Sequence, residues 1–163
     1  MNQVEVNKEA KLSPHFSLGE LTRSKSHPEV YNIPSHVHIE NLKRVCVWLE
    51  ALRARYNERY VLAGAGGEEP IIITSGYRSA ELNRKVGGVA TSNHLTGCAV
   101  DIRVAGKEQL IRYACILLDY ADETKQDFDE LLLEHGSKGV IWLHFAVRPP
   151  TQQNRRKISF LQG

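Results

Sequence analysis

The spacing of apolar residues predicts four helices, two of them long. Over residues 35–57, apolar side chains recur every three or four positions, as on one face of an amphipathic helix, and residues 107–120 repeat this pattern. A shorter helix is expected over residues 79–86, which end at a pair of glycines. Another is expected over residues 16–22, where Ser17 and the glutamate three positions later have the spacing of a capping box.

Short apolar runs predict the strands of one sheet. Residues 71–74 form a buried strand, and residues 99–104 alternate between core-facing and outward-facing positions. The runs 128–135 and 140–147 flank a Gly-Ser-Lys-Gly turn and are expected to pair as a hairpin, while residues 158–161 can add an edge strand. A small antiparallel sheet packed against helices makes an α+β fold.

Length and composition predict one ordinary globular domain. The chain has 163 residues, of which 42% are hydrophobic and 25% are charged. Residues 1–11 are polar and are expected to be flexible, so that the domain covers residues 12–163. The net charge of +2 is too small to indicate a nucleic-acid partner. The basic residues 155–157 are expected to form a solvated tail.

The cysteines and the hydropathy of the chain argue against an oxidising or membrane environment. Cys46, Cys98 and Cys115 include no C-x-x-C pair, so we expect no disulfide framework, and strand alternation places Cys98 in the core. No apolar run reaches the roughly 18 residues that a transmembrane helix needs. The first residues lack the hydrophobic region of a signal peptide. We therefore expect a monomer that is cytoplasmic as synthesised and has no membrane partner.

Three polar residues are candidate metal ligands. His94 and Asp101 lie seven positions apart with Gly97 between them, and His144 lies in the run 140–147. Imidazole and carboxylate are ligand types that hold catalytic Zn²⁺. Gly97 allows a tight turn, so that a loop-borne His94 can fold back beside Asp101 at the start of its strand. We expect these three side chains to hold one zinc ion, with the fourth position open for water.

Four stretches of the sequence together resemble one family of enzymes. They are residues 12–21, 73–79, 87–101 and 142–145, and they include a Ser-x-His-x-x-Gly-x-Ala-x-Asp motif and a later Trp-x-His. Over most of residues 12–147 the chain resembles the VanY-like zinc D-alanyl-D-alanine carboxypeptidases, which share the hedgehog/DD-peptidase fold. The full motif is a specific signal, whereas a lone His-x6-Asp would occur often by chance.

The resemblance implies a zinc peptidase that hydrolyses amide bonds in peptidoglycan stem peptides. It implies zinc on His94, Asp101 and His144, and substrate binding by Arg78 and Ser92. A planar guanidinium suits a stem peptide because it can grip a carboxylate with two hydrogen bonds.

Two other activities fit the same resemblance. One is an L-alanyl-D-glutamate endopeptidase of the endolysin kind, and the other is a non-catalytic wall-binding module that keeps zinc for structure. For the enzymes, action at the cell wall would follow synthesis in the cytoplasm, so a holin-like partner could release the protein.

Two neighbouring residues are candidates for the general base of the reaction. Relatives commonly supply a Glu or His shortly before the last ligand, but Ile141 occupies the position three before His144. A two-residue hairpin turn would place His135 on the face of His144, whereas a loop with an odd number of residues would place Glu134 there. A buried carboxylate after three leucines is costly unless it serves a purpose. We therefore predict Glu134 as the base.

Overall fold

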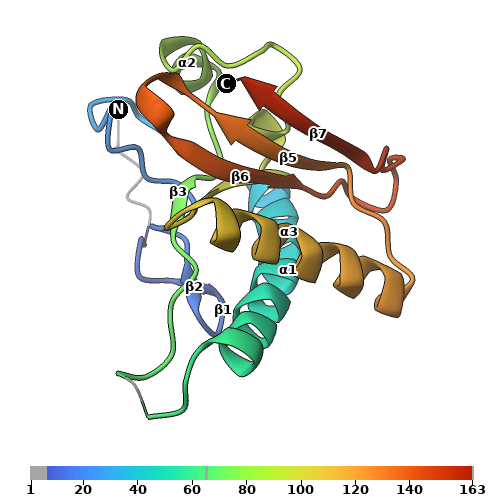
Figure 1. Ribbon diagram of the computed structural model, residues 1–163. Coiled ribbons are helices and arrows are strands. Elements are labelled where there is room, and N and C mark those ends of the chain that lie inside the picture. Colours follow the sequence, from blue (N-terminus) through green and yellow to red (C-terminus); the bar gives the residue numbers. More distant parts are fainter. Residues whose placement is uncertain (1–6, 65, 163) are drawn as a thin grey trace.

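The computed structural model describes residues 7–64 and 66–162 and has an α+β fold, as predicted (Figure 1). Its elements in chain order are β1 (Lys11–Ser13), β2 (Phe16–Ser17), α1 (His36–Tyr60), β3 (Ile73–Ser75), α2 (Ala80–Lys85), η1 (Asn93–Thr96), β4 (Ala99–Arg103), α3 (Lys107–Thr124), β5 (Glu130–His135), η2 (Ser137–Gly139), β6 (Ile141–Ala146) and β7 (Lys157–Gln162). The main sheet has the strand order β3-β4-β6-β5-β7, and β1 pairs with β2 in a separate ribbon. Neighbouring strands of the main sheet are antiparallel except β5 and β7, which are parallel. In Figure 1, α1 and α3 lie on one side of this sheet and α2 lies on the other.

Helix α1 packs against the apolar face of the sheet and starts where the sequence predicts. Ser35 Oγ accepts a hydrogen bond from the His38 backbone N–H (3.3 Å), and His38 Nδ1 accepts one from the Ser35 N–H (3.2 Å). These bonds occupy N–H groups that have no partner within the helix. Farther along α1, the fully buried Leu49 and Trp48 reach the core, where Trp48 contacts Phe145 of β6 with ring centroids 5.2 Å apart.

The short helix predicted over residues 16–22 is wrong. The first two of these residues form β2, and the others make turns. The predicted capping contact does exist, since the Glu20 backbone N–H donates to Ser17 Oγ (3.3 Å). The turn does not continue as a helix because the Leu21 carbonyl instead accepts a hydrogen bond from the distant Tyr77 N–H (2.8 Å).

The basic residues 155–157 do not form a free tail, although Arg155 and Lys157 are exposed to solvent as predicted. Arg155 Nη2 donates to the buried carboxylate of Asp129 (2.8 Å), and Arg156 Nη2 donates to Asp122 at the end of α3 (2.7 Å). These contacts lead the chain into β7, which pairs with β5 and confirms the edge strand expected at residues 158–161.

At the other end of the chain, residues 1–6 of the segment predicted to be flexible lie outside the described residues. The carbonyls of Lys8 and Ala10 accept hydrogen bonds from the backbone N–H groups of Gly19 and Leu18 (2.9 and 2.8 Å). Within residues 7–64 and 66–162, no helix has both the length and the apolar character needed to cross a bilayer. The domain boundary at residue 12, the monomeric state and the cytoplasmic origin stay predictions.

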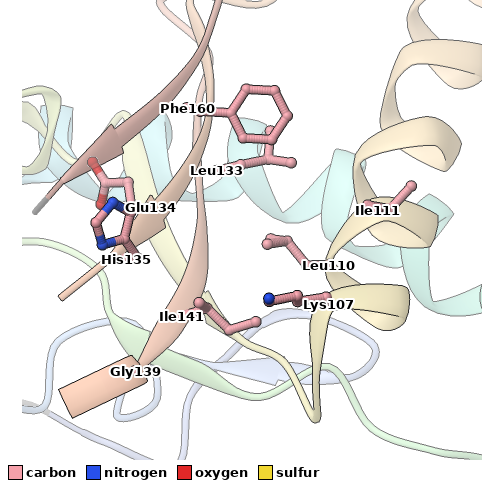
Figure 2. Close-up of a pocket in the computed structure, with 9 residues that line it drawn as sticks. All are labelled: Lys107, Leu110, Ile111, Leu133, Glu134, His135, Gly139, Ile141 and Phe160. Atoms are coloured by element: carbon pink, nitrogen blue, oxygen red, sulfur yellow. The ribbon is translucent and has the colours of Figure 1, made fainter. Parts of the chain in front are cut away.

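The helix side of the sheet is apolar, because alternate strand residues point to opposite faces. The buried residues that the central strands contribute to the core on this side are Val100, Ile102, Leu131, Leu133, Leu143 and Phe145. Toward β7, the sheet extends beyond α3 and leaves a groove of about 410 Å³. Figure 2 shows Leu110 and Ile111 of α3 lining this groove opposite Leu133 and Phe160 of the sheet. Ile111 is therefore half exposed.

Candidate metal centre

His94 is fixed by a short helical turn and by a backbone carbonyl. Ser92 Oγ accepts a hydrogen bond from the His94 backbone N–H (3.2 Å), and η1 ends at Gly97, whose φ of 76° is in the left-handed region that favours glycine. The buried ring donates from Nδ1 to the Gly76 carbonyl (2.7 Å), which leaves the lone pair on Nε2. This nitrogen lies 3.3 Å from Asp101 Oδ1.

Asp101 and His144 lie directly opposite each other on adjacent strands. The register of β4 and β6 pairs them, so both side chains leave the same face of the sheet. His144 Nδ1 lies 3.1 Å from Asp101 Oδ1. The structure thus brings together the three residues predicted as ligands: His94, Asp101 and His144 each offer one donor atom, and these atoms lie within 4.8 Å of one another.

This donor set fits a zinc ion. Tetrahedral donors at about 2.0–2.2 Å from zinc are about 3.3 Å apart, which agrees with the distances of 3.3 and 3.1 Å from Asp101 Oδ1 to the two rings. The other nitrogen of each ring is already bonded: His94 Nδ1 to a carbonyl, and His144 Nε2 to Glu130 Oε1 at 3.1 Å. Such outer contacts fix the metal-binding tautomers. Within the described part of the chain, no fourth His, Cys, Asp or Glu joins the set, so one coordination position is left for water or substrate.

Burial and mutual contacts shift the pKa values of all three side chains. Burial raises the pKa of Asp101, but the neighbouring His94 and His144 outweigh this effect and hold the pKa of the carboxyl well below its usual value. Burial lowers the pKa of His144, but hydrogen bonds to Asp101 and Glu130 raise it to about 9. At His94 burial dominates and lowers the pKa. A metal ion therefore meets an ionised Asp101, a neutral His94, and a His144 that must release a proton.

Arg78 is anchored beside the ligands. Its Nη2 donates to Asp101 Oδ2 (3.2 Å), its Nε to Ser75 Oγ (3.0 Å) and its Nη1 to Asn83 Oδ1 (3.3 Å). A guanidinium has five N–H groups, so two are left over for another acceptor. Arg78 therefore holds the second oxygen of Asp101 in place and can still present donors to a substrate carboxylate.

The hairpin register places Glu134 on the face of the sheet that carries Asp101 and His144. His144 pairs with Leu132, two residues before Glu134, because the loop between β5 and β6 has an odd number of residues. The alternative base, His135, falls on the opposite face. Burial raises the pKa of Glu134 by more than the neighbouring His144 lowers it. No ion pair with a described residue holds the Glu134 carboxylate.

Glu130 is a site residue that the sequence analysis missed. Its Oε1 lies 3.1 Å from His144 Nε2 and accepts a hydrogen bond from Asn93 Nδ2 (2.6 Å). Burial alone would raise the pKa of Glu130, but the bond to His144 and the bond from Asn93 lower it. Glu130 is thus occupied in orienting a ligand, whereas Glu134 is free to accept a proton. The period of two along β5 could have indicated Glu130, because it lies four residues before Glu134 and so shares its face.

These side chains line a cleft of about 540 Å³. The predicted site residues along it are Arg78, Ser92, His94, Asp101, Glu134 and His144. Trp142, which lies opposite Glu134 in the strand register, forms part of its wall. Ser92 lines the cleft while its oxygen caps η1, so its contact with substrate stays a prediction.

A comparison with known families identifies the kind of enzyme. The model of the M15 peptidases matches residues 14–119, well over half of the chain. The chain belongs to the M15 peptidase family. This family includes the VanY D-alanyl-D-alanine carboxypeptidases, so the resemblance predicted from the motifs is confirmed. No curated protein matches the chain.

The M15 match covers only part of the metal centre. It contains His94 and Asp101 and ends before Glu134 and His144, which the fold brings to them. M15 peptidases are zinc-dependent and act on peptidoglycan peptides. This chain is therefore a metallopeptidase of the kind that acts on peptidoglycan. The His-Asp-His group is its candidate zinc site.

Proposed function

We propose that this M15 peptidase is a D-alanyl-D-alanine carboxypeptidase of peptidoglycan stem peptides, with zinc on His94, Asp101 and His144. The proposal rests on one observation. Three candidate ligand atoms, of which two lie 3.1 and 3.3 Å from Asp101 Oδ1, converge on the face of the sheet that also carries Glu134, whose carboxylate forms no ion pair with a described residue.

Glu134 has the properties that a general base of amide hydrolysis needs. A bound zinc ion would supply Lewis acidity, which polarises the scissile carbonyl and acidifies water. Glu134 then takes the proton of the attacking water and delivers it to the leaving amine. Because burial raises its pKa toward neutrality, the carboxyl can both accept and return this proton.

Arg78 supports a substrate with a carboxylate next to the bond that is cut. Its guanidinium contacts the ligand Asp101 at 3.2 Å, so its two remaining N–H groups lie close to the reacting bond. In a peptide that ends in D-alanyl-D-alanine, the terminal carboxylate belongs to the residue directly after the scissile bond. Arg78 can bind that carboxylate bidentately and so orient the peptide.

The endopeptidase alternative satisfies the same contact. In an L-alanyl-D-glutamate unit, the α-carboxylate of the glutamate also follows the scissile bond directly, so Arg78 would suit either substrate. A non-catalytic zinc module is less well supported, because structural zinc sites are normally closed by four protein ligands and the described residues offer three.

Metal analysis combined with peptide digestion tests this function. Purified protein is assayed for zinc per chain and incubated with a full stem pentapeptide, with and without a chelator, and the products are identified by mass spectrometry. One zinc per chain and chelator-sensitive loss of a single alanine are expected. Cleavage between L-alanine and D-glutamate would instead establish the endopeptidase, and zinc without any cleavage would favour the binding module.

A further inference from the structure

The wall of the cleft on the β7 side carries three cations that the proposed reaction does not use. Arg148, Arg155 and Lys157 all line the cleft, and all follow the stretch that matches the M15 family. We call these three residues the cation wall. Opposite them, across the metal ligands, Arg78 is the cation on the β3 side of the cleft.

A buried carboxylate fixes two members of the cation wall. Asp129, whose side chain is 0% exposed, accepts hydrogen bonds from Arg155 Nε and Nη2 (3.0 and 2.8 Å), and Arg148 Nε lies 3.2 Å from the same carboxylate. Asn93 donates to it as well (2.7 Å). The two guanidinium groups are therefore pre-oriented, and little rotamer entropy would be lost when they bind a further anion.

The cation wall has positive charge left over. The acidic groups that face it are Asp129 and Glu130, with Glu130 Oε2 3.6 Å from Arg155 Nη2, so the wall has one more cation than there are carboxylates. The third cation, Lys157, is exposed and forms no ion pair with any described residue. Arg155 Nη1 likewise donates to no acceptor among the described residues. These donors are available to a ligand in the cleft.

The strand order fixes how far the cation wall lies from the metal ligands. Lys157 is paired with Glu130 on β5, and β5 is paired with β6, which carries His144. Two strand steps of about 4.8 Å lead from Lys157 through Glu130 to Ala146, two residues beyond His144, so Lys157 and His144 are about 12 Å apart. An extended peptide covers that distance in about three to four residues. Arg78, by contrast, touches the ligand Asp101 directly.

We propose that the cation wall is a second carboxylate-binding subsite, which takes an acidic group about three to four residues from the scissile bond on the side opposite Arg78. This inference rests on the proposed function and narrows its substrate to peptides with carboxylates on both sides of the bond that is cut. A stem peptide meets this requirement when its internal carboxylates are free, and fails it when they are amidated.

The test compares stem peptides in which each internal carboxylate in turn is replaced by its amide. Amidation at one position, away from the residue that binds Arg78, should lower kcat/KM about fivefold to tenfold through KM, as expected for a partly exposed charged hydrogen bond. Lys157→Gln should lower kcat/KM to a similar extent for the free carboxylate and have no effect on the amidated peptide. Lys157 is the preferred position because it has no internal partner to lose.

Arg156→Gln is the matched control. It removes the same charge from the adjacent residue, whose guanidinium bonds to Asp122 and Asp127 instead of lining the cleft. The inference is overturned if every amidated peptide is cut within twofold of its parent, or if Lys157→Gln and Arg156→Gln behave alike.

A binding measurement separates this inference from the function. Zinc-loaded Glu134→Ala is titrated with the same peptides by calorimetry, alone and combined with Lys157→Gln. If the wild type cuts no peptide, the proposed function fails, but weaker binding of one amidated peptide that depends on Lys157 still supports the subsite. Equal binding of all peptides rejects it.

Discussion

On strands β5 and β6, residues that are neighbours in the chain lie in opposite environments. Toward the helices, Leu131 and Phe145 are fully buried among apolar side chains. Toward the cleft, Glu130 and His144 are bonded to each other and to polar groups. Each site residue is thus flanked in sequence by residues whose packing fixes the backbone. A small domain can therefore hold several charged groups rigidly without a separate scaffold for them.

The two faces also differ in how they are stabilised. The helix face gains free energy from apolar burial, at about 25 cal/mol for each Å² removed from water. On the cleft face, buried charges cost free energy unless they are paired. Asp101 has a partner for each oxygen, in the two histidine rings and Arg78. Changes on one face should therefore affect folding, and changes on the other should affect the metal and the chemistry.

The largest effect is expected from a metal ligand. His144→Ala removes one of three donors and leaves Asp101 and Glu130 without their shared partner, so the protein should lose zinc and peptidase activity together. Metal analysis after dialysis and a stem-peptide assay measure both. A variant that keeps a full complement of zinc would show that the His-Asp-His group is not the metal site.

The next effect separates the two carboxylates of the cleft face. Glu134→Ala should lower kcat about 10²–10⁴-fold, because proton transfer is lost, while zinc binding stays intact. The matched variant is Glu130→Ala, which should weaken zinc binding about 10–100-fold, because His144 loses the acceptor that orients it. Zinc affinities and kcat values of both variants are compared. A reversed result, with zinc weakened only in Glu134→Ala, would exchange the two roles.

A substitution on the helix face should lower the stability of the fold and leave zinc binding intact. Leu131→Ala, adjacent to Glu130 in sequence, should lower the free energy of unfolding by about 2–5 kcal/mol by creating a cavity under the sheet. The fraction that stays folded should still bind one zinc per chain. Urea denaturation and metal analysis of the folded protein test this. Loss of zinc without loss of stability would contradict the division between the two faces.

The last effect is a pH dependence of the metal centre. In the metal-free protein the pKa of His144 is raised to about 9, so below that pH zinc must displace a proton. The apparent zinc affinity should rise tenfold for each pH unit and level off near pH 9. His94, whose pKa is lowered, should not add to this slope. Competition with a chelator between pH 7 and 10 measures it, and a flat profile below pH 8.5 would exclude His144 as the titrating ligand.

The same shift affects the stability of the metal-free protein. The folded pKa of His144 lies above the unfolded value of about 6.5. Its contribution to stability is therefore fully present below pH 6.5 and is lost as the pH rises through about 9. Unfolding of the metal-free protein across this range gives an independent check of the assignment.

Local sequence patterns predicted the long helices and the three residues of the His-Asp-His group, because spacing and residue type determine those features. They failed where a distant segment decides the outcome. The turn after Ser17 does not become a helix because Tyr77 binds the Leu21 carbonyl. Arg155 is not a free tail residue because Asp129, 26 residues earlier, accepts its hydrogen bonds. The choice between two candidate bases likewise depended on hairpin register, which the sequence left open.

Strand β7 has a hydrogen-bonded neighbour on one side only, and most of its side chains are exposed. Segments with few buried contacts open before the rest of a protein does. On gentle warming, β7 should detach from β5 while the metal ligands on β4 and β6 stay in place. Its departure would remove Lys157 from the cleft and leave the zinc ligands and Glu134 where they are. A warmed sample should then still cut peptides but should favour acidic ones less strongly, because the cation wall would retain Arg148 and Arg155 and lose Lys157.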